Sequence, residues 1–148
     1  MPAGRVVVDT NVYIMAIRQG RDGPAGVRLV EWFPRSYLVS VVSAELRAGA
    51  RSRQARAEVE IFTAAFERVG RVVTPTAHSW NQAGDTLALI ARARPDLGDA
   101  VLDLWNDTLI ALSARQVGAT VVSANVDDFG LLLAHVNFRF EPFPQHSD

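Results

Sequence analysis

The chain has 148 residues, of which 49% are hydrophobic and 21% charged, and its formal net charge is −1, which is typical of one globular domain. It has no cysteine, which excludes disulfides, thiol nucleophiles and thiolate-bound zinc or iron–sulfur clusters. Its three histidines are scattered, which argues against a histidine-bound zinc site, and all 15 basic residues are arginine, which excludes chemistry that needs a lysine amine. We therefore expect any metal ion to be bound through oxygen atoms.

Short runs of β-branched residues alternate with longer helical stretches, which predicts an α/β domain with a mainly parallel sheet. The predicted strands, in chain order, are residues 5–9, 37–42, 71–74, 120–123 and 138–140. One predicted helix is capped by Asn11 and runs to Ile17, and another is capped by Ser43. The other predicted helices are residues 25–33, 55–69, 76–93, 101–117 and 131–134. A polar turn is predicted at 125–129 and a frayed tail at 142–148, within a single domain spanning residues 1–148.

Charge is distributed unevenly along the chain. Residues 1–95 contain 13 arginines and 8 acidic residues, whereas residues 96–148 contain 2 arginines and 8 acidic residues. No run of about 18 apolar residues is present, and Asp9 interrupts the first apolar run before it reaches the length of a signal-peptide core. We therefore expect a cytoplasmic protein.

Polar residues follow the predicted strands at the points where ligands gather in open parallel sheets. These residues are Asp9, Thr10 and Asn11 after the first strand, Ser43 and Glu45 after the second, and Ser123, Asn125, Asp127 and Asp128 after the fourth. Asp107 lies near the start of the helix that leads into the fourth strand, and a right-handed crossover places that end of the helix at the same edge of the sheet.

Four carboxylates at one edge repel one another by about 4 kcal/mol per pair at 4 Å and an effective dielectric constant near 20, unless protons or cations lie between them. Carboxylate, amide and hydroxyl oxygens are the ligands preferred by Mg²⁺ and Mn²⁺. Such an ion lowers the pKa of a bound water and polarises a phosphodiester, so this pattern indicates phosphodiester hydrolysis.

Four segments of the chain resemble the PIN-domain family, and most closely the VapC-type toxin ribonucleases. They are VVVDTNV at residues 6–12, SVVSAELRAG at 40–49, NDTLIALSA at 106–114 and GATVVSANVDDF at 118–129. The resemblance covers nearly the whole chain and implies a three-layer α/β/α domain with a central, mainly parallel sheet flanked by helices.

The resemblance also assigns residues to roles. It implies that four carboxylates bind Mg²⁺ or Mn²⁺ and catalyse RNA cleavage that leaves 5′-phosphate and 3′-hydroxyl ends: Asp9, Glu45, Asp107 and Asp128. The matching supporting residues are Thr10, Asn11, Ser123 and Asn125, with Ser123 at a position where threonine is usual. Asp103 and Asp127 are possible additional acids. The implied partners are a cognate antitoxin, which plugs the acidic pocket, often with an arginine, and a second copy of the chain.

A basic run with no acidic residue between positions 46 and 57 follows Glu45 and consists of Arg47, Arg51, Arg53 and Arg56. It is interpreted either as a solvated helix face or as a track for RNA phosphates, and its position beside the acidic residues favours the track. The aromatic residues Tyr13, Phe33, Trp80 and Trp105 have helical spacing that favours core or dimer packing over stacking on bases.

Three other functions are compatible with parts of this pattern. A PIN-fold nuclease could act in RNA processing or on structured DNA without an antitoxin, and a binding module could keep the fold but not the catalysis. A phosphoacceptor receiver domain also has an acidic Mg²⁺ pocket at its strand ends, but it requires a lysine, and this chain has none.

Overall fold

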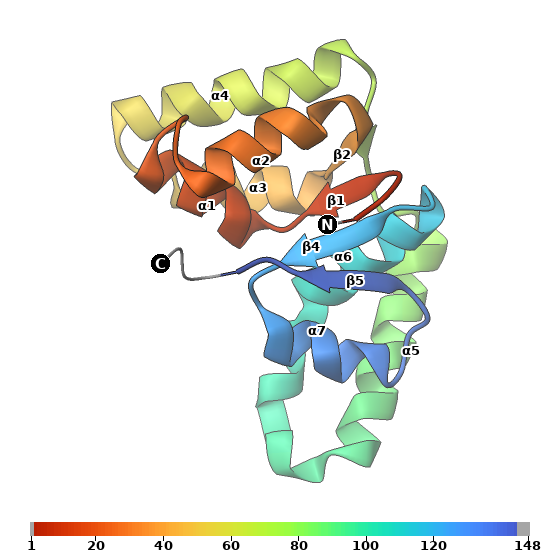
Figure 1. Ribbon diagram of the computed structural model, residues 1–148. Coiled ribbons are helices and arrows are strands. Elements are labelled where there is room, and N and C mark those ends of the chain that lie inside the picture. Colours follow the sequence, from red (N-terminus) through yellow and green to blue (C-terminus); the bar gives the residue numbers. More distant parts are fainter. Residues whose placement is uncertain (1, 145–148) are drawn as a thin grey trace.

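The computed structural model describes residues 2–144, which form a five-stranded parallel sheet with the strand order β3-β2-β1-β4-β5 (Figure 1). The strands are β1 (Val6–Val8), β2 (Ser36–Val39), β3 (Val72–Val73), β4 (Thr120–Ser123) and β5 (Arg139–Pro142). In the centre of the sheet Val6 of β1 lies opposite Ser36 of β2 and Thr120 of β4. The predicted mainly parallel α/β architecture is confirmed.

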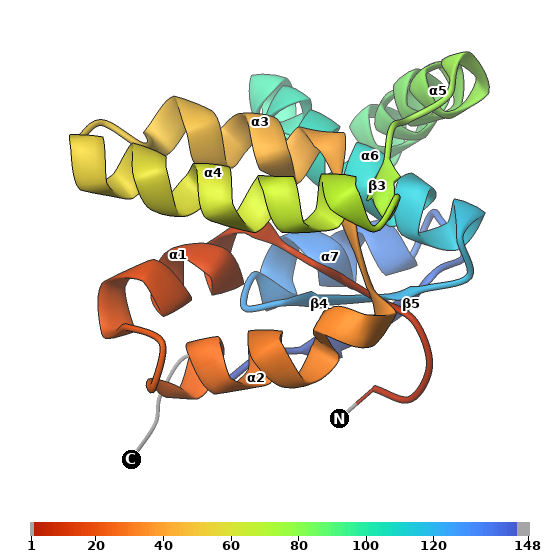
Figure 2. The ribbon, with the colours of Figure 1, turned by 90° about the horizontal axis from the view of Figure 1, so that it is seen from above.

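Helices lie on both faces of this sheet, with α3 and α4 on one side and α2 on the other (Figure 2). The α-helices are α1 (Thr10–Gln19), α2 (Pro24–Trp32), α3 (Ser40–Gly49), α4 (Arg53–Arg68), α5 (Ala77–Ala93), α6 (Trp105–Gln116) and α7 (Val126–Leu133). Two 3₁₀ segments, η1 (Phe33–Arg35) and η2 (Pro95–Leu104), connect them. Within the described part of the chain, no helix is long and apolar enough to span a membrane.

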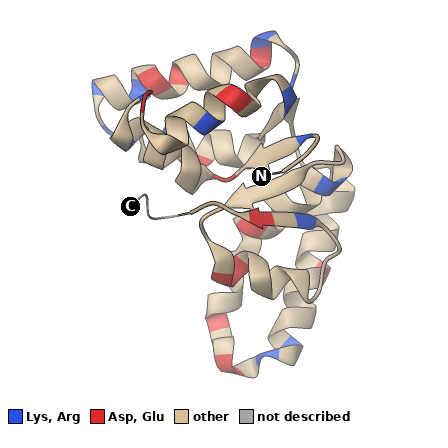
Figure 3. Ribbon diagram, in the orientation of Figure 1, with Lys and Arg blue, Asp and Glu red and all other residues tan. Residues whose placement is uncertain are grey.

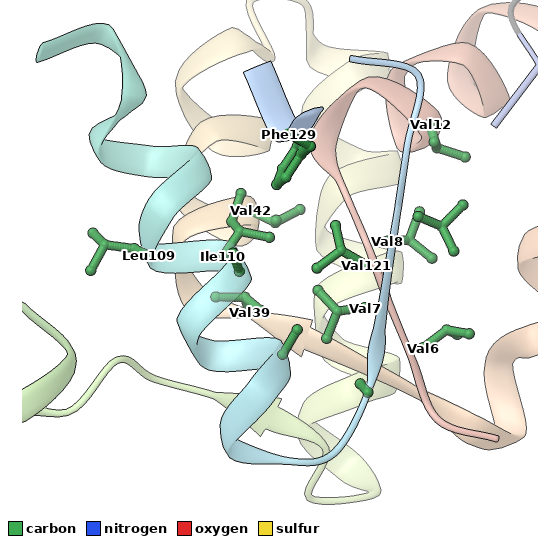
Figure 4. Close-up of a cluster of buried hydrophobic side chains, with 14 of the residues drawn as sticks. Val6, Val7, Val8, Val12, Val39, Val42, Leu109, Ile110, Val121 and Phe129 are labelled. Carbon is green, nitrogen blue, oxygen red and sulfur yellow. The ribbon is translucent and has the colours of Figure 1, made fainter. Parts of the chain in front are cut away.

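The two central strands are buried on both faces, because helices cover the sheet above and below. Val6 and Val7 are fully buried in β1, as is Val121 in β4. Ile110 of α6 and Val42 of α3 point toward these valines (Figure 4). Burial on both faces explains why these strands are continuous apolar runs, without the alternation expected of a half-exposed strand.

Two helices at the carboxyl ends of the strands begin earlier than predicted. Helix α1 begins at Thr10 and is capped by Asp9, which replaces the predicted cap Asn11. Helix α3 begins at Ser40, so β2 ends at Val39 and the predicted cap Ser43 lies inside the helix. The two valines after Ser40 suggested strand by propensity, but burial of a helical face against the core decides the conformation of this segment.

Two other boundaries also differ from the prediction. Residues 126–133 form one helix, α7, where a turn followed by a shorter helix was predicted, because the Asn125 side chain caps this helix. The predicted helix 101–117 is a regular α-helix only from Trp105, since the preceding η2 segment is 3₁₀. Gly98, with φ of 53°, breaks the helical geometry inside η2.

The predicted frayed tail begins inside an ordered segment. Pro142 ends strand β5, and Phe143 is only 6% exposed and contacts the Trp32 ring edge-on, with 6.2 Å between the ring centroids. Residues 145–148 of that predicted tail lie outside the described residues.

Candidate active site

The four predicted catalytic carboxylates come from four different elements and meet at the carboxyl edge of the sheet. Asp9 follows β1, Glu45 lies in α3, and Asp107 and Asp128 lie in the first turns of α6 and α7. Burial, the largest cause, and the charges of Asp9, Asp128 and Glu45 together raise the pKa of Asp107 to about 7. The four acids therefore share one electrostatic environment, although successive members lie 36, 62 and 21 positions apart in the sequence.

Asp9 is held by a network that joins α1 to β4. Its carboxylate accepts a hydrogen bond from the Ser123 hydroxyl at 2.7 Å and another from the Asn11 amide at 3.2 Å. The Asn11 amide also donates to Ser123 Oγ at 3.0 Å, and its oxygen accepts from the backbone N–H of Ala124 at 3.2 Å. Both supporting residues thus fix the position of Asp9, which is 5% exposed.

Burial raises the pKa of Asp9, while the hydrogen bonds from Ser123 and from the Thr10 backbone N–H act in the opposite direction. The network therefore partly offsets the effect of burial and favours the ionised form of Asp9. An ionised, well-oriented carboxylate is the form that can bind a cation.

Glu45 is held between α1 and α6. The Thr10 hydroxyl donates to Glu45 Oε1 at 3.1 Å, and the Asn106 side chain also forms a hydrogen bond with this carboxylate. Burial and the charge of Asp9 nevertheless raise the pKa of Glu45. Sequence reasoning did not single out Asn106; the signal available was its place directly before Asp107 in the NDTLIALSA segment.

Asn125 connects the remaining two acids. Its side-chain amide donates to Asp128 Oδ2 at 2.9 Å and to Asp107 Oδ2 at 3.4 Å. Its side-chain oxygen accepts from the backbone N–H of Asp128 at 3.3 Å, and its own backbone N–H donates to Ser123 Oγ at 2.9 Å. A single residue therefore caps α7 and separates two like charges.

The donor set of this site is chemically suited to a hard divalent cation, since it consists of carboxylate, amide and hydroxyl oxygens. In the part of the chain that the structure describes, no group of three or more His, Asp or Glu side chains is placed so that it could by itself hold a metal ion. Mg²⁺ is usually bound in proteins by one or two carboxylates together with several waters, so it does not require such a group. The residues present fit a hydrated ion of this kind.

The two additional acids lie outside the hydrogen-bonded site. Asp103 is exposed on η2, which is a 3₁₀ segment, so the regular helical turn predicted between Asp103 and Asp107 is absent. Asp127 is exposed in the first turn of α7 and lines a cleft next to Asn11 and Asn125.

The predicted basic run divides into two parts. Arg47 donates to Glu60, with which it forms an ion pair, and to Thr63 Oγ1, so contacts between α3 and α4 occupy its guanidinium group. Arg51, Arg53 and Arg56 are exposed and form no ion pair with any residue between 2 and 144. Figure 3 shows basic residues near the start of α4 and acidic residues along η2.

The aromatic residues pack mainly against one another, as their spacing predicted. Tyr13 is 2% exposed and contacts Phe62 edge-on, and the Phe33 ring lies 5.0 Å from that of Phe66. Trp80 is 50% exposed but pairs with Trp105 at 6.2 Å between ring centroids.

Residues 6–131 match the PIN-domain model, and the chain therefore belongs to the PIN-domain family. Among solved structures it is similar to the VapC and FitB toxins of VapBC and FitAB complexes. No curated protein matches the sequence.

Three of these structures match almost end to end. VapBC2 from Rickettsia felis, bound to a DNA fragment from its promoter, has a TM-score of 0.68 at 21% identity, covering 94% of this chain and 98% of that one. DNA-bound VapBC from Salmonella typhimurium has a TM-score of 0.66 at 22% identity, covering 95% of this chain and 98% of that one. FitAcB from Neisseria gonorrhoeae has a TM-score of 0.58 at 20% identity, covering 91% of this chain and 95% of that one. These similarities establish a PIN-like fold resembling that of the VapC toxins.

Proposed function

We propose that the chain is a Mg²⁺- or Mn²⁺-dependent endoribonuclease and the toxin of a VapBC-type toxin–antitoxin pair. The observation that carries this proposal is the convergence of Asp9, Glu45, Asp107 and Asp128 at one edge of the sheet, where burial together with the charges of the other three acids raises the pKa of Asp107 to about 7. Carboxylates held close together repel one another and lower the stability of the fold. A cation bound between them neutralises this repulsion and stabilises the protein.

Asp9, Glu45, Asp107 and Asp128 would hold the ion, and Thr10, Asn11, Ser123 and Asn125 would orient these carboxylates. When bound, a divalent cation supplies Lewis acidity, which lowers the pKa of water and polarises a phosphodiester. Phosphodiester hydrolysis follows from that chemistry, and RNA as the substrate follows from the resemblance to VapC toxins.

The proposal is tested by incubating the purified protein with total cellular RNA in Mg²⁺, in Mn²⁺ and in EDTA, and sequencing the new 5′-phosphate ends. We expect discrete cuts that require the divalent cation. A structured DNA substrate assayed in parallel tests the alternative of a DNA-directed or processing PIN nuclease. Absence of metal-stimulated cleavage of both substrates would favour a catalytically silent binding module.

RNA binding is proposed to involve the three exposed arginines near the α3–α4 turn: Arg51, Arg53 and Arg56. We expect the double substitution Arg51→Ala with Arg53→Ala to weaken RNA binding and to reduce the slope of log K against log salt by about 1.4, because each phosphate contact to single-stranded RNA contributes about 0.7. Arg28→Ala is the control, since Arg28 already pairs with Glu31 on the surface of α2. An unchanged salt slope would show that these arginines are only a solvated surface.

Besides the acidic pocket, which the family resemblance implies that the antitoxin plugs, we propose a second antitoxin contact at an apolar groove between α1, α2 and α4, with a volume of about 680 Å³. Val30 and Ile61 line it and are 65% and 64% exposed. Tyr13 also lines it, and its buried hydroxyl has no partner among residues 2–144. An exposed apolar surface of this kind is typical of a protein-binding site. The similar solved structures are toxin–antitoxin complexes, so we propose an antitoxin segment as its occupant.

Val30→Asp and Ile61→Asp are expected to reduce co-purification of the co-expressed antitoxin by tenfold or more while the free toxin still folds, because both side chains already face solvent. Leu133→Asp, on a 43% exposed side chain at the end of α7, is the matched control. Undiminished capture by both groove variants would rule out this surface.

Two further predictions remain. The family resemblance implies a homodimer, which sedimentation analysis tests directly, and we expect a cytoplasmic location.

A further inference from the structure

A second cleft lies beside the acidic site, between the start of α1 and the start of α7. It has a volume of about 510 Å³ and is lined by Asn11, Ala124, Asn125, Val126 and Asp127. Two of these residues touch the catalytic carboxylates directly, since Asn11 donates to Asp9 and Asn125 donates to Asp128. A group held in this cleft would therefore lie immediately next to a phosphodiester at the acidic site.

The side-chain amides of Asn11 and Asn125, which line the cleft, already form hydrogen bonds within the acidic site. Asn11 donates to Asp9 and Ser123 and accepts from Ala124, and Asn125 donates to Asp107 and Asp128 and accepts from Asp128. Neither side chain retains an unused N–H to offer to a ligand. The remaining lining side chains are Ala124, Val126 and Asp127, and of these only Asp127 can form a hydrogen bond with a ligand.

Asp127 carries an exposed carboxylate that makes no side-chain hydrogen bond or ion pair with the described residues. An ionised carboxylate only accepts hydrogen bonds, so its ligand must present N–H or O–H donors, and it repels phosphate. Val126 is 50% exposed beside it and offers an apolar contact. This combination suits the edge and face of a nucleobase and disfavours the sugar–phosphate backbone.

We propose that this cleft is a base-selection site in which Asp127 recognises a guanine of single-stranded RNA next to the cleaved bond. The inference rests on the proposed ribonuclease function and specifies its substrate. Guanine presents two adjacent donors, N1–H and the N2 amino group, which a carboxylate can accept in a bidentate arrangement. Adenine, cytosine and uracil each offer a single donor group on that edge, so the carboxylate discriminates against them.

The test measures binding of short single-stranded RNAs in EDTA, so that its readout does not depend on cleavage. Guanosine is replaced at one position after another by inosine, which lacks the N2 amino group. For the parent protein we expect inosine at one position to weaken binding by about fivefold or more, the lower limit for loss of a bidentate base contact. Asp127→Ala should bind guanosine and inosine RNAs equally, within twofold.

Asp103→Ala, on another exposed acid, is the matched control and should retain the full effect of inosine. Thermal melting of both variants verifies that they fold. The inference is overturned if inosine has no effect at any position in the parent, or if its effect persists in Asp127→Ala. Failure of the ribonuclease proposal has a different signature, namely no metal-stimulated cleavage of any RNA, whatever base the cleft prefers.

Discussion

Asp107→Asn is expected to lower metal-stimulated RNA cleavage by about 100-fold or more, because it removes a charge from the centre of the proposed metal site. Asp107 is the acid on which the fields of Asp9, Glu45 and Asp128 converge. Asp9→Asn should have a comparable effect, since Asp9 anchors the network through Ser123 and Asn11. Initial rates of cleavage across a Mg²⁺ or Mn²⁺ titration measure both effects.

The same Asp107→Asn substitution should stabilise the metal-free protein near pH 8. The folded-state pKa of Asp107 is raised to about 7 from an ordinary value of 3.8, so its ionisation opposes folding. For this group stability is greatest below about pH 4 and falls as the pH rises through 7. Replacing the charge should therefore raise the free energy of unfolding at pH 8 by on the order of 1–2 kcal/mol, and the gain should vanish near pH 4.

Urea unfolding in EDTA at pH 4 and pH 8 tests this sign directly. Asp85→Asn, an exposed acid on α5, serves as the control and should change neither cleavage nor the pH dependence of stability. A variant of Asp107 that cuts RNA as fast as the parent would remove this residue from the active site. A variant less stable than the parent at pH 8 would contradict the proposed repulsion.

Ser123→Ala and Ser113→Ala are expected to differ sharply although both serines are fully buried. The Ser123 hydroxyl donates to Asp9 and accepts from Asn11 and the Asn125 backbone, whereas Ser113 Oγ has no partner in the described structure. Removing a hydroxyl from a hydrogen-bonded network leaves its buried partners unsatisfied, which lowers the free energy of unfolding by about 1–3 kcal/mol. Removing an unpaired buried hydroxyl should change stability by less than about 1 kcal/mol, or increase it.

Activity should separate the two variants as well. Loss of the Ser123 hydrogen bond leaves Asp9 free to reorient and removes an interaction that opposes the burial-driven rise of its pKa. We expect cleavage or metal affinity to fall by about 10–100-fold in Ser123→Ala, the range found when a partner of a metal ligand is removed. Ser123→Thr, which keeps the hydroxyl, should restore most of the activity. Equal activities for Ser123→Ala and Ser113→Ala would show that the network has no positioning role.

Long, strongly patterned segments of the fold were predictable, and element boundaries less so. The β-branched runs at 6–8 and 120–122 and the Gly118 stop before the second of them identified the two central strands. The start of α3 was predicted four residues late, because Val41 and Val42 have high strand propensity and only packing against the core reveals that they are helical. The single helix α7 was missed because Asn125 was interpreted as a turn residue and is in fact a cap.

The sequence by itself determined the chemical inventory of this protein: no thiol, no amine, and carboxylates placed directly after apolar strands, which is enough to indicate an oxygen-liganded divalent cation. The tertiary structure decided which groups are available. In the folded protein Arg47 forms an ion pair with Glu60, Asn106 forms a hydrogen bond with Glu45, and Asp127 lies in a cleft, unpaired among the described residues. The reason is physical. Residue type and spacing follow from local backbone geometry, whereas burial, pairing and the pKa of a carboxyl depend on neighbours that only folding brings within reach.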